Sequence, residues 1–125
     1  MSSHDIEAFA AAWLQAWNDR DLEAILAHYA DDVELRSPLV VHLLGEASGS
    51  VSGKQKLRDY FARVLEAFPG KPEAALLDVS QGVASIVVHF QFNGGTGAEL
   101  MELTADGMVR RAIAHVRAER ERTVG

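Results

Sequence analysis

The chain contains no cysteine, only three prolines and no long apolar run. Without cysteine there can be no disulfide, thiolate metal ligand or thiol nucleophile, and the composition fits a reducing cytoplasm. No apolar stretch approaches the roughly 18 residues that a membrane-spanning helix needs. The N-terminus lacks the basic and apolar regions of a signal peptide. We therefore expect a cytoplasmic protein that does not interact with a membrane.

Positive charge is also scarce. Twelve Lys and Arg residues stand against eighteen Asp and Glu residues, for a net charge of −6. Because this charge repels a phosphate backbone, we expect no nucleic-acid partner. The five histidines are spread along the chain, with no two spaced to share a helix face or a strand face. Since a metal site needs several convergent ligands, the sequence predicts no metal and no cofactor.

What the chain does contain is an ordinary globular composition. Its 125 residues are 48% hydrophobic and 24% charged, enough to bury one core. No repeat or linker divides the sequence. We expect a single domain over residues 1–117, followed by a charged tail over residues 118–125.

Helical periodicity marks three segments, all in the first 70 residues. Ser3 is the expected cap of the first helix and Asp21 that of the second, while Ser52 and Gln55 resemble a capping box before the third. Apolar residues recur at helical spacing in each segment. These stripes are Ile6, Phe9, Ala10, Trp13 and Trp17; Leu22, Ile25, Leu26 and Tyr29; and Leu57, Tyr60, Phe61, Val64, Leu65 and Phe68.

Alternating patterns predict strands elsewhere. Val33, Leu35 and Ser37 share one face of a short strand that ends at Pro38, and residues 38–53 read as an irregular connection. Helices first and an antiparallel meander last predict an α+β fold with the helices on one sheet face. The meander strands are expected at residues 73–80, 83–92, 98–104 and 108–117, the last two joined by the hairpin signal Asp106-Gly107.

Aromatic side chains with polar tips gather on the faces expected to point inward. Each one alone is most simply a core residue, but convergent aromatics with a few polar groups are typical of small-molecule pockets. Ser37 is the serine placed on an inward face, and its simpler interpretation is a small residue at the end of a strand. The aromatic candidates are Trp13, Tyr29, Tyr60, Phe61 and Phe90.

Glu99 is the candidate catalytic residue, as an acid–base group. Met101 and Leu103 are the apolar alternate positions of their strand, so alternation places Glu99 on the same inward face. A carboxyl group there must be paired, hydrogen-bonded or neutral, and burial would raise its pKa. The alternative is a position at the strand's edge, where the carboxylate reaches water or an arginine. The sequence leaves both interpretations open.

The order of the motifs along the chain is more specific than any one of them. Trp13 and Trp17-Asn18 lead into Asp21-Leu22-Glu23-Ala24-Ile25, then Tyr29-Ala30-Asp31-Asp32-Val33 and Ser37-Pro38. Gly53-Lys54, Leu57, Tyr60-Phe61, the Gly82 turn and Asp106-Gly107 follow. Taken together, this pattern resembles the SnoaL-like proteins of the nuclear transport factor 2-like superfamily over nearly the whole chain.

The resemblance implies a cone-shaped, cystatin-like fold. In that fold three N-terminal helices pack on a curved antiparallel sheet around an apolar cavity, and the proteins are usually dimeric. We expect a homodimer through the outer sheet face, because a sheet that is apolar on both sides needs a second cover. The outward apolar positions are Leu77, Val87, Leu100 and Ile113.

The superfamily includes ketosteroid isomerases, polyketide cyclases, epoxide hydrolases and non-catalytic modules, so the fold alone selects no function. By resemblance, Trp13 and Glu99 occupy the two oxyanion-hole positions of ketosteroid isomerases. Ser37 stands where those enzymes have their aspartate base, so isomerisation by that route lacks its base. Steroid turnover is therefore not expected.

Two hypotheses of different classes remain. In the first, the pocket binds a small, largely apolar molecule, such as a polyketide-, terpenoid- or steroid-like compound, with Glu99 as the acid–base group. In the second, the chain is a non-catalytic dimerisation or ligand-sensing module. The predicted ligand-binding residues of the first hypothesis are Trp13, Tyr29, Ser37, Tyr60, Phe61, Phe90 and Met101.

Overall fold

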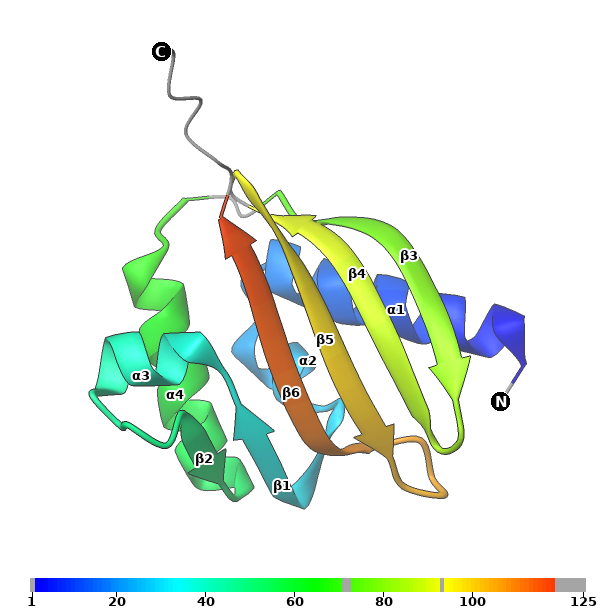
Figure 1. The fold of residues 1–125 in the computed structure, drawn as a ribbon, viewed down its shortest axis with the longest axis horizontal. Helices are drawn as coiled ribbons and strands as arrows, with labels where there is room; N and C mark the ends of the chain where they lie inside the picture. Colours follow the sequence, from blue (N-terminus) through cyan, green and yellow to red (C-terminus); the bar gives the residue numbers. More distant parts are fainter. Residues whose placement is uncertain (1, 71–72, 93, 119–125) are drawn as a thin grey trace.

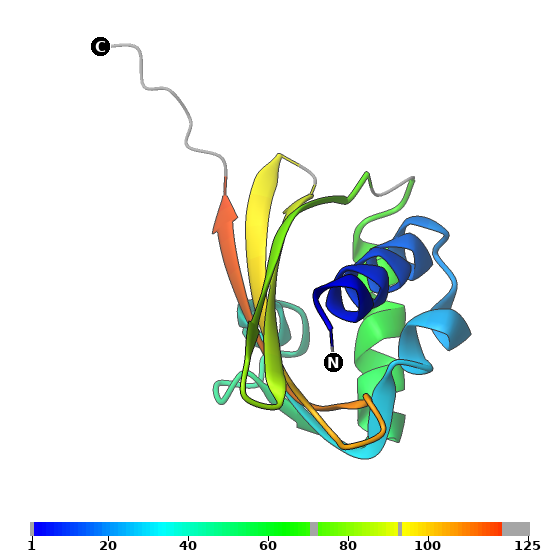
Figure 2. The ribbon, with the colours of Figure 1, turned by 90° about the vertical axis from the view of Figure 1, so that its right-hand side faces the viewer.

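A computed structural model describes residues 2–70, 73–92 and 94–118, which form a helical layer against a curved sheet (Figures 1 and 2). In these residues no helix is long and apolar enough to cross a membrane. The helices are α1 (Ser3–Asn18), α2 (Leu22–Leu26), α3 (Pro38–Leu44) and α4 (Lys54–Ala67). The strands are β1 (Tyr29–Arg36), β2 (Ser50–Ser52), β3 (Ala75–Gly82), β4 (Ser85–Phe92), β5 (Gly95–Leu103) and β6 (Val109–Ala118).

The predicted meander is present as β3 to β6, each strand antiparallel to the next. The sheet is not wholly antiparallel, because β1 runs parallel to β6 in the order β2-β1-β6-β5-β4-β3. Tyr29 is the first residue of β1, so its placement on the second helical stripe was wrong. Helical spacing runs past Leu26, where α2 ends, and cannot show where the chain becomes extended. Residues 119–125 of the expected tail lie outside the described residues.

Residues 38–53 are not an irregular connection, because they hold α3 and β2. Ser37 caps α3 by accepting a hydrogen bond from the backbone N–H two residues on, at 3.2 Å. Pro38 follows at the first helical position, where a missing N–H costs nothing. Gly45 ends the helix at a φ of 71°, in the left-handed region. The start and stop signals were therefore in the sequence, but the helix is too short for periodicity to reveal it.

The caps of the first two helices lie close to where they were predicted. Ser2, rather than Ser3, caps α1: its hydroxyl accepts from the N–H of Asp5 at 3.2 Å, and the Asp5 carboxylate accepts from the N–H of Ser2 at 3.1 Å. These two hydrogen bonds form a capping box, and the cap lies one residue earlier than the predicted Ser3. Asp21 caps α2 as predicted, accepting from the N–H of Ala24 at 3.1 Å.

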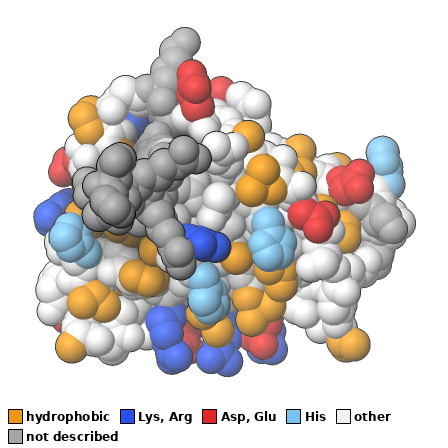
Figure 3. Space-filling view, turned by 45° about the horizontal axis from the view of Figure 1, so that its top comes forward, with side chains coloured by type: hydrophobic (Ala, Val, Ile, Leu, Met, Phe, Trp, Pro, Cys, Tyr) orange, Lys and Arg blue, Asp and Glu red, His pale blue; other side chains and the backbone are white. Residues whose placement is uncertain are grey.

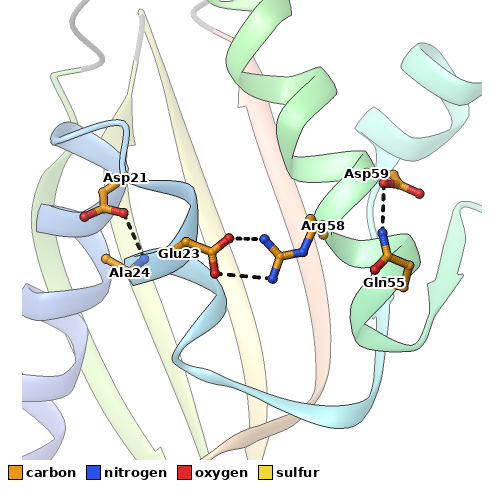
Figure 4. A network of polar contacts seen from close by, with 6 residues as sticks. All are labelled: Asp21, Glu23, Ala24, Gln55, Arg58 and Asp59. Atoms are coloured by element: carbon orange, nitrogen blue, oxygen red, sulfur yellow. Dashed lines mark hydrogen bonds and ion pairs between the residues drawn. The ribbon is translucent and has the colours of Figure 1, made fainter.

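The capping box predicted for α4 does not form. Gly53 is the N-cap and offers no side chain; its φ of 88° lies in the region that favours glycine. The N–H of Gly53 donates instead to the carbonyl of Val33 at 2.7 Å, which attaches the start of α4 to β1. The Gln55 amide donates to Asp59 one turn along the same helix, at 3.3 Å (Figure 4). Tertiary contact with the strand has thus replaced the local cap.

The core fills the space between the helices and the inner face of the sheet. Ile86, Met101 and Ala112 form one row across β4, β5 and β6, and all three are buried. The adjacent row, Val87, Leu100 and Ile113, points to the outer face and is half-buried. This alternation confirms the inward and outward faces that period-two patterning predicted for β4, β5 and β6.

Gly97 leaves room for an aromatic ring on the inner face. It lies opposite Phe90 in the β4–β5 ladder, and a Cβ atom on Gly97 would come within 2.7 Å of Cε2 of that ring. The ring also packs edge-on against Trp13, at 5.5 Å between centroids, which limits how far it can withdraw. A side chain at Gly97 would therefore displace a ring that belongs to the core.

We expect Gly97→Ala to destabilise the protein by about 1–3 kcal/mol through overpacking. Urea unfolding measures the change. The matched control is Gly97→Ala combined with Phe90→Leu, which removes the ring and should cost less than the sum of the two single changes. An unchanged urea midpoint for Gly97→Ala would show that the ring is free to move aside.

Candidate ligand-binding pocket

A cavity of about 100 Å³ lies between the helical layer and the sheet. Its mouth is bordered by His115 and Val116 near the end of β6, both of which are exposed. The lining is almost entirely apolar and rich in aromatic rings. It includes Trp13, Leu14 and Trp17 from α1; Tyr60, Phe61, Val64 and Leu65 from α4; Phe68 and Ala74 from the segments next to α4 and β3; and Leu35, Phe90, Phe92, Glu99 and Ala114 from the sheet.

Edge-to-face pairs of aromatic rings hold the walls of the cavity. In each pair the edge of one ring meets the face of the other, the arrangement that ring quadrupoles favour. The contacts join α1 to the sheet, α1 to α4, and the end of α4 to the sheet, so the rings are not free to collapse into the cavity. The pairs are Trp13–Phe90 at 5.5 Å, Trp17–Phe61 at 5.0 Å and Phe68–Phe92 at 5.9 Å between centroids.

Trp13 and Tyr29 form a buried hydrogen bond at one end of the aromatic cluster. The indole Nε1 of Trp13 donates to the hydroxyl of Tyr29 at 3.0 Å. Burial raises the pKa of Tyr29 well above its ordinary value, so the phenol stays neutral. Tyr29 is fully buried and does not line the cavity, and the same holds for Met101. The Trp13 N–H is therefore already engaged, which argues against an oxyanion-hole role for it.

Ser37 and Tyr60 both reach the cavity from beside α3 and α4. Ser37 is buried, and its hydroxyl caps α3. Burial raises the pKa of Tyr60 to about 12, while the Ser37 hydroxyl opposes the rise and the Glu99 carboxyl adds to it. Ser37 and Glu99 thus both act on the Tyr60 phenol at the pocket wall. Five of the predicted ligand-binding residues line the cavity with Glu99, namely Trp13, Ser37, Tyr60, Phe61 and Phe90. Tyr29 lies behind them, hydrogen-bonded to Trp13.

Glu99 lies in the middle of β5, opposite Val88 on one side and Ala114 on the other. It is 7% exposed and lines the cavity, so it is not at an edge of the sheet. Burial raises the pKa of Glu99 to about 8. Its Oε2 atom is buried and has no hydrogen-bond partner among the described residues. At neutral pH the site therefore presents a largely protonated carboxyl group to an apolar space.

Trp17 is a lining residue that the pocket prediction missed. Its indole Nε1 is buried and, in the described residues, has no hydrogen-bond partner. The signal was present, because Trp17 continues the stripe of Trp13 four residues later. The pattern could not show which of the two indoles would find an internal acceptor.

The turn after α1 fixes one side of the mouth. Arg20, with a φ of 55°, donates to the carbonyls of Leu65 at 2.7 Å, Phe68 at 2.8 Å and Gly70 at 3.1 Å. These are carbonyls at and beyond the end of α4 that lack helical partners. Its guanidinium lines the cavity but serves as a cap for that helix.

Asn18 fixes the other end of the same wall. Its side-chain amide donates to the carbonyl of Ala74 at 2.9 Å and accepts from the N–H of Ala74 at 2.8 Å. Farther from the cavity, Glu23 and Arg58 join α2 to α4 through two hydrogen bonds (Figure 4). In the parts of the chain that the structure describes, no group of three or more His, Asp or Glu side chains is placed to hold a metal ion.

Comparison with known proteins agrees with this geometry. The family described as the SnoaL-like domain matches residues 10–124. The chain belongs to the SnoaL-like domain family. No match was found among curated proteins. The resemblance inferred from the motif order is therefore confirmed.

Solved structures place this SnoaL-like domain in the nuclear transport factor 2-like, cystatin-like fold. A SnoaL-like protein of unknown function from Burkholderia thailandensis E264 is 32% identical, with 94% of this chain and 98% of that chain covered and a TM-score of 0.88. An NTF-2 like protein of unknown function from Burkholderia xenovorans LB400 is 20% identical, with coverage of 97% and 89% and a TM-score of 0.69. A protein of unknown function with a cystatin-like fold from Methylobium petroleophilum PM1 is 14% identical, with coverage of 100% and 84% and a TM-score of 0.70.

The raised pKa of Glu99 makes a prediction about stability. Between its usual value of 4.5 and about 8, the folded protein holds a proton that the unfolded chain releases. The contribution of Glu99 to the free energy of unfolding should therefore be highest below pH 4.5. It should fall by up to about 1.4 kcal/mol per pH unit until about pH 8. Urea unfolding at a series of pH values measures this slope.

Glu99→Gln should remove that component of the slope, because the amide does not titrate. Glu102→Gln is the matched control: it lies on the same strand but on the outer face, beside Arg110 at 3.7 Å, and leaves the buried carboxyl in place. If Glu99→Gln kept the wild-type pH profile, the Glu99 carboxyl would have to be solvated or paired.

Proposed function

We propose that this SnoaL-like domain binds a small, largely apolar molecule in its cavity, with Glu99 as a neutral acid that donates a hydrogen bond to an oxygen atom of the ligand. The observation that carries the proposal is a buried carboxyl group in an aromatic cavity, whose Oε2 has no hydrogen-bond partner among the residues that the structure describes. A buried polar group without a partner is costly, so a ligand that forms a hydrogen bond with it gains binding free energy.

The protonation state of Glu99 selects the kind of partner. A protonated carboxyl group donates one hydrogen bond, and a carbonyl oxygen is a suitable acceptor. Most of the remaining lining is hydrocarbon, which suits a ring-containing apolar ligand. Polyketide-, terpenoid- and steroid-like carbonyl compounds have this combination. A longer molecule would extend through the mouth past His115 and Val116.

The same group is suited to acid–base chemistry. A pKa of about 8 allows Glu99 to hold a proton at neutral pH and to release it at little cost. We propose that any isomerase- or cyclase-type step uses Glu99 to protonate the ligand's oxygen. Ser37, at the position of the ketosteroid isomerase base, is a helix cap with a buried hydroxyl, so it supplies no base.

Binding of 1-indanone, a small aromatic ketone, tests the proposal. We expect binding in calorimetric titration, with the affinity falling about tenfold between pH 7 and pH 9 as the donor loses its proton. Glu99→Gln, whose amide still donates but does not titrate, should bind the ketone with no such fall. The amine 1-aminoindane is the opposing probe. Tighter binding of the amine than of the ketone, or a pH-independent affinity for the ketone, would contradict the proposed role of Glu99.

The second candidate is a dimerisation or ligand-sensing module without catalysis, favoured by the outer face of the sheet. Val87, Leu100 and Ile113 form an apolar row across β4, β5 and β6 on that face. Leu77 on β3 is 56% exposed. Hydrophobic side chains gather beside histidines in the oblique view of the molecule in Figure 3. We propose that a second copy of the chain covers this face, whether or not the cavity is catalytic.

We expect the protein to sediment as a dimer at micromolar concentration and Leu100→Lys to sediment as a monomer. The lysine would place a charge at the centre of the apolar row, which is unfavourable in a buried interface. Val83→Lys is the control, because Val83 is 98% exposed at the turn between β3 and β4 and should leave association unchanged. A monomeric wild-type protein would rule out the dimer.

A further inference from the structure

Trp17 lines the cavity from the helical layer and carries a buried polar atom that lacks a partner among the described residues. In the part of the chain that the structure describes, its Nε1 is buried without a hydrogen-bond partner, as is Oε2 of Glu99, and both residues line the same cavity. Trp13, one turn earlier on α1, also lines the cavity but donates its N–H to Tyr29 at 3.0 Å. The two tryptophans of the chain therefore differ in what their N–H groups do.

The packing of the Trp17 ring prevents its N–H from finding a partner in the solvent. The ring packs edge-to-face on Phe61, at 5.0 Å between centroids and 79° between planes, so the N–H cannot easily turn toward water. α1 covers the inner face of the sheet (Figure 2). Glu99 lies on that face, in register with the buried Val88. Trp17 and Glu99 thus belong to the two facing layers that enclose the cavity.

The chemistry of an indole restricts what can satisfy it. An indole N–H donates and never accepts, so its partner must be an acceptor. The partly positive edge of the ring also repels a cation. A protonated Glu99 likewise offers a donor. Both unpartnered groups therefore favour a ligand with acceptor oxygen over a bare hydrocarbon or an ammonium ion.

We propose that Trp17 is a specificity-determining residue, whose Nε1–H donates a hydrogen bond to an acceptor oxygen of the ligand. This inference rests on the proposed function and deepens it. Trp13 has the structural role, and Trp17 selects oxygenated ligands from hydrocarbons of the same shape.

The experiment compares 1-indanone with indane, which has the same ring system without the oxygen. The readout is the ratio of their affinities, measured by calorimetric titration for the wild type and for Trp17→Phe. Phenylalanine keeps an aromatic ring but removes the donor. We expect the ratio to fall about fivefold, the effect of one hydrogen bond. Trp13→Phe is the comparison, and it should change the affinity for both probes by the same factor.

A second measurement uses the unaltered protein. Because the chain has two tryptophans, its ¹H–¹⁵N spectrum has two indole N–H signals, which the two variants assign. Adding 1-indanone should move the Trp17 signal downfield, as expected for a new hydrogen bond, and move the Trp13 signal less. This titration decides the question even if Trp17→Phe does not fold.

The outcomes separate this inference from the proposed function. Suppose that both probes bind, that Trp17→Phe has the same affinity ratio as the wild type, and that the Trp17 signal does not move. The role of Trp17 is then overturned, while the ligand-binding pocket stands. If neither probe binds the wild type, the pocket function fails and this inference fails with it. A lower affinity ratio for Trp17→Phe together with a downfield shift of the Trp17 signal supports the role of Trp17.

Discussion

Burial of the sheet's inner face against α1 and α4 is the interaction on which the rest of the structure depends. The row Ile86, Met101 and Ala112 is fully covered, as are the helical residues that face it. The sheet curves around the helical layer (Figure 2). Between the two layers, large aromatic rings meet edge-on and line a cavity. The pocket is thus part of the interface between the helical layer and the curved sheet.

Polar groups inside this apolar interior fall into two classes. Trp13 and Tyr29 satisfy each other, and Ser37 caps a helix, so these groups support the structure. Oε2 of Glu99 and the indole N–H of Trp17 have no such partner in the described residues. Since unpaired buried groups are costly, this division separates the polar groups that hold the fold from those that a ligand could satisfy.

The short turn after α1 links the core to the mouth of the cavity. Asn18 holds the approach to β3, and Arg20 holds the end of α4. Asn18 and Arg20 are two positions apart in the sequence, whereas their hydrogen-bond partners lie far along the chain. Because two residues anchor both sides of one wall, the mouth is tied to the orientation of α1. The shape of the entrance is therefore coupled to the packing of the helix that carries Trp17.

The sequence by itself determined which faces point inward. Helical spacing placed Trp13 on the buried side of α1, and period-two alternation placed Met101 on the inner face of the sheet, because both patterns depend on neighbouring residues alone. For Glu99 the alternation offered the inner face but left an edge position open. The motif order was specific enough to indicate the family. Asp21 as a cap was also predicted, since a cap acts within one helical turn.

Only the tertiary structure decided the features that depend on distant partners. The start of α4 at Gly53 follows from its bond to Val33, and the parallel pairing of β1 with β6 joins segments from opposite ends of the chain. The choice between the two indoles belongs to the same class. Trp13 and Trp17 are equivalent in the helical pattern, and they differ because the hydroxyl of Tyr29 reaches one of them and not the other. A repeating pattern specifies the direction of a side chain, whereas the atom that it meets is set by the packing of the whole chain.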